Sequence, residues 1–66
     1  MITTDELVEL VELAELLGAR VRIEWKRSPG GAMVPDRITV RHLPGIGPFP
    51  MPPLAAAEAI RAAIAI

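Results

Sequence analysis

One stretch of alternating residues constrains the fold of this chain more than any other feature. From residue 19 to residue 27 the sequence reads Ala-Arg-Val-Arg-Ile-Glu-Trp-Lys-Arg, so apolar and charged side chains alternate. Successive side chains of a strand point to opposite faces, so one face of this segment is apolar and the other is charged. The pattern predicts a half-buried β-strand whose apolar face the rest of the chain must cover.

The segment before this strand has the signals of an amphipathic helix over residues 4–17. Thr3 is placed to cap the helix, and Glu6, three residues later, completes a capping box. Glutamates recur along one side of the helix and aliphatic residues fill the other side. Leu13 and Leu16 fall beside the glutamates, so they are candidates for a second contact surface.

A second strand is expected over residues 37–42, where the β-branched Ile38 and Val40 would share the buried face. A turn-rich stretch, residues 28–35, connects the two strands. The opposite face of this hairpin would be basic. Regularly spaced cations on a two-stranded ribbon can contact the phosphates of nucleic acid. The candidate nucleic-acid-binding residues are Arg20, Arg22, Lys26, Arg37 and Arg41. The acidic helix is the alternative partner for these side chains, within one chain or between subunits.

Two side chains near the ends of the hairpin have alternative interpretations. Trp25 ends the apolar face of the first strand, where it would be either the largest anchor of the core or a hot spot for a partner. His42, the single histidine, can line up with the inner face, where it would be either a hydrogen-bonded core residue or a ligand or pH switch.

Residues 43–53 carry five prolines in eleven positions, so they cannot form a regular helix or a central strand. Phe49 and Met51 make the segment too apolar for a flexible linker. We therefore expect an extended, polyproline-like strap that lies on the core or on a partner. Phe49 and Met51 are candidate partner contacts.

Part of this strap, Leu-Pro-Gly-Ile-Gly-Pro at residues 43–48, resembles the hairpin of helix-hairpin-helix DNA-binding motifs. In that family the Gly-hydrophobic-Gly turn presents backbone amides to a DNA phosphate, so the resemblance carries over only Gly45 and Gly47. The family continues with a helix, whereas the prolines that follow here forbid an immediate one. The β-branched segment before the turn also departs from the family's first helix.

An alanine-rich helix is predicted to close the chain over residues 53–66. Its only charged residues, Glu58 and Arg61, can pair at a spacing of three. A helix that is apolar nearly all round is usually buried, and a 66-residue chain has little protein to surround it. We therefore expect a second subunit to cover it, although exposed alanines in a helix also cost little. The expected contacts with that subunit include Ala59, Ala62 and Ile66. An edge strand that extends the sheet into the second subunit is the other expected contact, alone or together with the helices.

The composition points the same way. A single domain of 66 residues buries only about 60% of the surface of its unfolded chain, so its stability is marginal without help. The chain has no cysteine, which excludes disulfides, and one histidine, which argues against a metal site. With 52% hydrophobic residues, the chain is expected to share apolar surface with a partner.

No set of nucleophile, base and orienting group can be assembled from these residues, so we expect neither an enzyme nor a cofactor. The net charge is -1, but five acids lie in residues 1–18 and six bases in residues 19–43, which makes the chain dipolar. Without a signal-peptide pattern or a long apolar run, a cytoplasmic protein with no membrane contact is expected. The Ala-, Arg-, Gly- and Pro-rich composition suggests a GC-rich bacterium or one of its phages.

These patterns predict an α+β fold: a small α-β-β-α domain, residues 1–66, in which a two-stranded antiparallel hairpin packs against two helices. The expected function is that of a protein-protein interaction module, such as a small adaptor, inhibitor or assembly subunit, that forms a homodimer. The alternative is a small DNA-binding or regulatory protein that uses the basic face of the hairpin.

Overall fold

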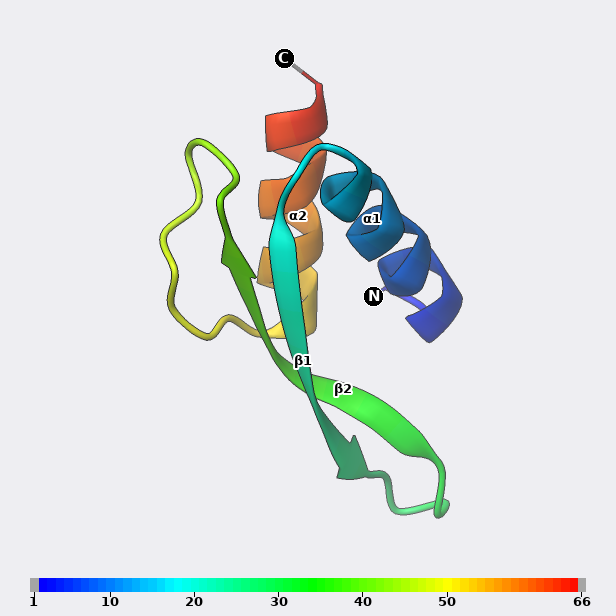
Figure 1. The fold of residues 1–66 in the computed structure, drawn as a ribbon. Coiled ribbons are helices and arrows are strands. Elements are labelled where there is room, and N and C mark those ends of the chain that lie inside the picture. The colour runs from blue at the N-terminus through cyan, green and yellow to red at the C-terminus, as the bar shows by residue number, and fades with distance from the viewer. Residues whose placement is uncertain (1, 66) are drawn as a thin grey trace.

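The computed structural model describes residues 2–65 and has the predicted order of elements, helix, strand, strand and helix. The elements are α1 (Thr4–Leu16), β1 (Arg20–Arg27), β2 (Met33–Arg41) and α2 (Pro53–Ile64). The strands form a two-stranded antiparallel sheet, and both helices lie on the same side of it (Figure 1). The predicted α+β fold is confirmed.

The first helix begins as its sequence predicts. The Thr3 side chain accepts a hydrogen bond from the Glu6 backbone N–H at 3.1 Å, which satisfies one of the free amides of the first turn. The helix ends at Leu16, one residue earlier than predicted. Gly18 follows with a φ of 96°, a left-handed conformation that glycine adopts at little cost.

The second strand is longer than predicted, because it begins at Met33 and not at residue 37. In the register, Glu24 lies opposite Arg37 but Trp25 lies opposite Pro35, so Asp36 is an extra residue in β2. Such a bulge reverses the alternation of faces and is one of the places where a strand tolerates proline. Residues on both sides of the bulge can therefore point inward, and Pro35 is buried.

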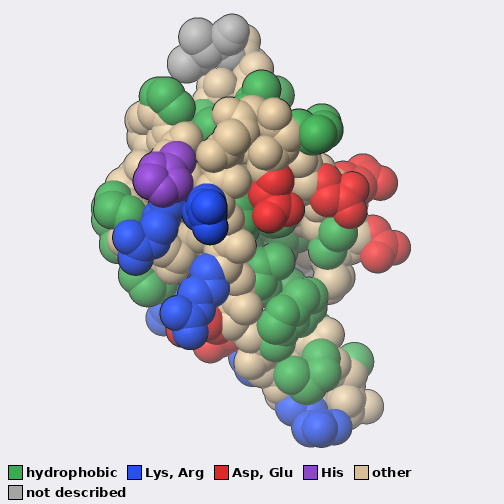
Figure 2. All heavy atoms as spheres, viewed as in Figure 1, with side chains coloured by type: hydrophobic (Ala, Val, Ile, Leu, Met, Phe, Trp, Pro, Cys, Tyr) green, Lys and Arg blue, Asp and Glu red, His purple; other side chains and the backbone are tan. Residues whose placement is uncertain are grey.

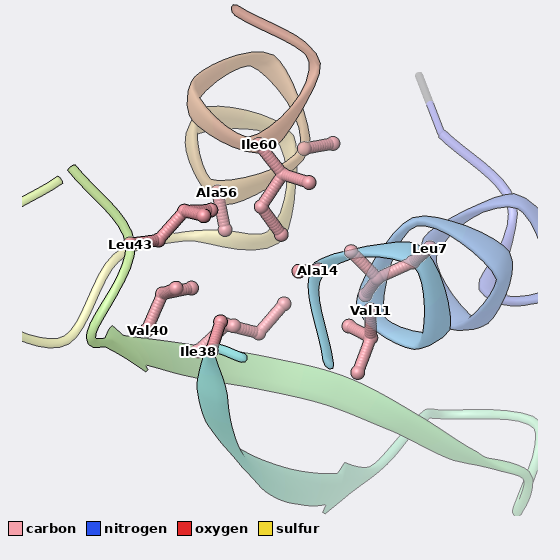
Figure 3. Packing of buried hydrophobic residues seen from close by; sticks show 10 residues of the cluster. Leu7, Val11, Ala14, Ile38, Val40, Leu43, Ala56 and Ile60 are labelled. Atoms are coloured by element: carbon pink, nitrogen blue, oxygen red, sulfur yellow. The ribbon is translucent and has the colours of Figure 1, made fainter. Parts of the chain in front are cut away.

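The core is aliphatic and lies between the sheet and the two helices. Side chains of β2 point toward both helices, where side chains of α1 and α2 meet them (Figure 3). The buried residues are Leu7, Val11, Ala14, Ala19, Ile38, Val40, Leu43, Ala56, Ala57 and Ile60. Val21 and Ile23 of β1 pack against this cluster but are only partly buried. The hydrophobic effect on these side chains, about 1.5–3 kcal/mol for each large one, holds the domain together.

Two predictions about the inner face of the hairpin are wrong. Trp25 is 45% exposed, so it is not the anchor of the core, and its alternative role as a hot spot for a partner stays a prediction. It lies beyond the bulge, where the hairpin has passed the helices that cover the rest of the sheet (Figure 1). His42 is exposed and has a φ of 64°, because the chain turns away from the sheet directly after β2.

The proline-rich strap lies against the domain's own sheet. The backbones of Ile38 and Met51 exchange two hydrogen bonds, at 2.8 and 2.9 Å, on the edge of β2 that is not paired with β1. Gly45 forms a turn with a φ of 88°, but a strand precedes this turn and an extended segment follows it. The resemblance to a helix-hairpin-helix motif therefore does not extend beyond the turn.

The closing helix is covered on one face only. Its inner residues, including Ile60, are fully buried by α1 and β2, while Glu58 and Ala62 are exposed. Arg61 does not pair with Glu58 as predicted. Its Nη2 atom lies 3.7 Å from Oε2 of Glu6, so the ion pair joins α2 to α1.

Candidate functional site

The end of the hairpin projects from the body of the domain. We call residues 25–35, which lie beyond the bulge, the hairpin arm; they extend past both helices (Figure 1). The molecule measures 37 × 19 × 17 Å and exposes 4531 Å², whereas a typical folded monomer of this mass exposes roughly 4,100 Å². The arm contributes large apolar side chains to this excess, because Trp25 is 45% and Met33 is 52% exposed.

An apolar groove of about 550 Å³ lies beside the arm, between it and the first turns of both helices. None of the residues that line it is charged. Its volume is in the range of sites that bind small molecules or inserted side chains. The apolar part of its lining includes Ile2, Leu7, Val34, Pro35, Pro53 and Leu54.

The groove and the arm form one continuous apolar surface. Pro35 lines the groove, and it lies directly opposite Trp25 in the sheet register. Leu54, on the far wall, is 47% exposed. Hydrophobic side chains follow the length of the arm in Figure 2. We call this surface, the groove together with Trp25 and Met33, the groove face.

The other side of the sheet carries a basic surface. Because Ile38 and Val40 point toward the helices, the residues that alternate with them point away. With Glu24 and Thr39, this outward face carries four exposed arginines, which we call the arginine cluster: Arg20, Arg22, Arg37 and Arg41. Lys26, the fifth predicted cation, lies beyond the bulge and pairs with Asp36 at 3.4 Å. Blue Lys and Arg side chains follow the hairpin in Figure 2, and most of the red carboxylates gather elsewhere, over α1.

The other predicted partner-binding residues are not gathered in one place. Leu13 and Leu16, 47% and 81% exposed, lie in the C-terminal half of α1, away from the groove at its N-terminal end. Phe49 is 59% exposed on the strap, whereas Met51 is partly buried by its pairing with Ile38. Partly buried Ala59 and exposed Ala62 line a smaller hollow of about 170 Å³ beside the strap. Ile66 lies outside the described residues.

Sequence reasoning missed the contribution of Met33, Pro35 and Leu54 to the groove face. A proline in a turn-rich stretch is typical of a loop. No local sequence pattern indicated that the second strand begins as early as Met33. The signal that was available is the apolar character of residues 32–35 next to glycines and a proline, which is unusual for a solvated turn.

The interior of residues 2–65 contains no buried polar or charged side chain. In the same part of the chain, no three acidic or histidine side chains come together in a way that suits a metal ion. None of the helices described there has the length and apolarity needed to cross a bilayer. Comparisons of the chain with protein-family models, with curated proteins and with solved structures found no match.

Proposed function

We propose that this protein is a non-enzymatic protein-interaction module that works as a homodimer, joined through the groove face. The observation that supports this most is the position of Trp25 opposite Pro35, which sets an exposed aromatic side chain at the rim of an apolar groove. In a two-fold dimer the same patch serves both copies. The arm of each copy can lie in the groove of the other, so one arrangement fills both grooves.

The size of the surface is compatible with this role. A stable interface buries about 800 Å² on each partner, and the molecule exposes 4531 Å², so less than a fifth of its surface is needed. Tryptophan at the centre of an interface is a common hot spot, because it buries a large area with few rotatable bonds. Burial of Trp25 and Met33 would also add stability to a domain that is too small for a large core.

Such a dimer leaves other apolar side chains free for a second protein. Leu13 and Leu16 on α1 and Phe49 on the strap lie outside the groove lining and are exposed. An adaptor, an inhibitor or an assembly subunit needs surfaces of this kind beyond its own dimer contact. We place the dimer at the groove face and assign these three side chains to the outside partner.

Sedimentation velocity across the micromolar range tests the dimer. The wild-type chain should sediment as a dimer, and Trp25→Ala should shift the equilibrium at least tenfold toward the monomer. Phe49→Ala is the matched control, because it removes an exposed aromatic ring outside the groove lining and should leave the dimer intact. A wild-type chain that stays monomeric throughout, or a Phe49 variant as defective as the Trp25 variant, contradicts the proposal.

A further inference from the structure

The arginine cluster is contiguous across the two strands. Arg20 lies directly opposite Arg41, and Arg22 lies opposite Thr39. In an antiparallel pair, directly opposed Cβ atoms are roughly 4.5–5.5 Å apart and diagonal neighbours are roughly 7–8 Å apart. Arg22 is therefore a diagonal neighbour of both Arg37 and Arg41. The four guanidinium groups can reach a common ligand.

Within residues 2–65 the positive charge of this cluster is only partly offset, by Glu24, which lies opposite Arg37. The ion pairs found in residues 2–65 are Lys26 with Asp36 and Arg61 with Glu6, and neither includes a member of the cluster. Glu24 is the only acid in the paired segments 20–24 and 37–41, so four positive charges and one negative charge leave a net charge of +3 there. Like charges directly opposite each other destabilise a sheet, and an anion between them removes that cost.

The surface around the cluster is unlike a protein interface. Stable protein interfaces have an apolar core with few charges, but no large exposed hydrophobic side chain lies on this part of the sheet. Those found in residues 2–65 are Leu13, Leu16, Leu17, Trp25, Met33, Phe49 and Leu54. Ion pairs between exposed side chains contribute little by themselves. An acidic protein surface, including α1 of a second copy, would therefore be held weakly.

The same surface has the composition of a nucleic-acid interface, which is polar and strongly positive. Arginine binds phosphate through two parallel hydrogen bonds, which the point charge of lysine does not do. Every cation in the paired segments 20–24 and 37–41 is an arginine, and the one lysine on the hairpin pairs with Asp36. A two-stranded ribbon also fits the major groove of B-form DNA, whereas the major groove of an RNA duplex is too deep and narrow for protein side chains to read.

We propose that the arginine cluster binds the phosphate backbone of double-stranded DNA. Binding is governed mainly by phosphate contacts and depends little on base sequence, because the paired segments 20–24 and 37–41 offer on this face four arginines, Glu24 and Thr39, and no aromatic side chain that could stack on a base. The cluster and the groove face share no residue, because the cluster lies in the paired segments 20–24 and 37–41 and the groove face lies on the arm and the first turns of the helices. DNA binding therefore does not require the proposed dimer.

Fluorescence anisotropy of a short labelled duplex, titrated with the full chain at increasing salt, tests this inference. Each phosphate contact contributes about -0.9 to the slope of log K against log salt, so four arginines predict about -3.6 for each copy bound. A fourfold rise in salt should then weaken binding about 150-fold. No binding at low salt overturns the proposal.

A pair of charge-matched variants separates the cluster from net charge. Arg22→Gln with Arg41→Gln should reduce the slope to about -1.8, so that the same rise in salt weakens binding only about 12-fold. Arg27→Gln with Arg61→Gln removes the same charge outside the cluster. Arg27 instead contacts the Gly31 carbonyl at the tip of the arm, and Arg61 pairs with Glu6. This control should keep the slope of the wild type, and circular dichroism checks that both variants are folded.

Three other outcomes overturn the inference. Equal losses in the two variants would mean that binding follows net charge alone, and tighter binding to duplex RNA than to DNA would exclude the ribbon-in-groove geometry. Binding of an acidic peptide in place of DNA would make the cluster a protein site. Sedimentation of the same samples keeps the two proposals apart, because a monomer that binds DNA refutes the dimer and supports the arginine cluster.

Discussion

Trp25 lies opposite Pro35 across the hairpin, although its neighbour Glu24 lies opposite Arg37. The extra residue between them, Asp36, bulges from β2, and a bulge bends its strand and increases the local twist. Beyond the bulge the hairpin arm extends past the helices, so Trp25 stays exposed while Pro35 lines the groove. One inserted residue thus creates the apolar surface on which the proposed dimer depends.

The fluorescence of Trp25 reports directly on that surface, because it is the only tryptophan of the chain. If the partner's groove covers it, its emission should shift to shorter wavelengths as the protein concentration rises. Leu54→Asp places a charge on the groove wall and should abolish the shift. Leu16→Asp introduces the same charge on α1, outside the groove lining, and should retain it. An emission maximum that ignores concentration in the wild type argues against the dimer.

We expect the arginine cluster to lower the free energy of unfolding of the protein when no ligand is bound. Replacing Arg20 with threonine removes the like-charge pair with Arg41, so Arg20→Thr should raise the free energy of unfolding by about 0.2–1 kcal/mol at low salt. The gain should shrink at high salt, where exposed charges are screened. Urea denaturation at two salt concentrations measures it. Arg22→Thr, opposite Thr39, is the control and should gain less; a loss of stability in Arg20→Thr contradicts the argument.

Ile38 joins the sheet both to the core, through its side chain, and to the strap, through its backbone. Its side chain is fully buried, it lies opposite Ile23 of β1 in the register, and its backbone N–H and C=O both bond to Met51 of the strap. Ile38→Val should lower the free energy of unfolding by about 0.5–1.5 kcal/mol, since the lost methylene leaves a cavity. Ile23→Val makes the same change at the position opposite, which is only partly buried, and should cost less. Equal costs in urea denaturation would show that burial does not separate the two positions.

The hydroxyl group of Thr3 should stabilise α1. Thr3→Ala removes the acceptor for the Glu6 backbone N–H and should cost about 0.5–2 kcal/mol. Thr3→Ser keeps the oxygen and should restore most of the stability, which separates capping from the loss of a methyl group in the groove. Thermal unfolding followed by circular dichroism measures both variants, and equal losses in the two would refute the capping role.

Gly45 holds the turn of the strap in a left-handed conformation. Its φ is 88°, so Gly45→Ala should cost about 1–2 kcal/mol through backbone strain, even though a methyl group there meets no other atom. Gly30→Ala is the matched control, because a methyl group at that turn position meets only the Ser28 side chain at 3.9 Å and its φ lies outside the left-handed range. Urea denaturation should show a loss for Gly45→Ala only.

Local patterns predicted the elements that depend on local contacts. The alternation of residues 19–27 identified β1, and the capping box of Thr3 and Glu6 identified the start of α1 to the residue. The start of α2 at Pro53 was also correct. Each of these signals involves residues that are close together in the sequence, so the prediction did not require the contacts of distant segments.

The errors concern contacts between distant segments. The predicted start of β2 was four residues too late, because Pro35 lacks the N–H that a regular strand uses and only the pairing partner shows that a bulge accommodates it. Trp25 was expected either in the core or at a partner surface, and the choice depends on where the helices end relative to the hairpin. No local sequence pattern shows how far the helices reach along the hairpin.

The sequence by itself determined the order of the elements, the aliphatic character of the core and the separation of acidic α1 from a basic hairpin, because these follow from residue type and period. Only the tertiary structure decided which apolar side chains stay in water and which arginines stand opposite each other. Both depend on strand register, and one extra residue in β2 changes the register of every pair beyond it.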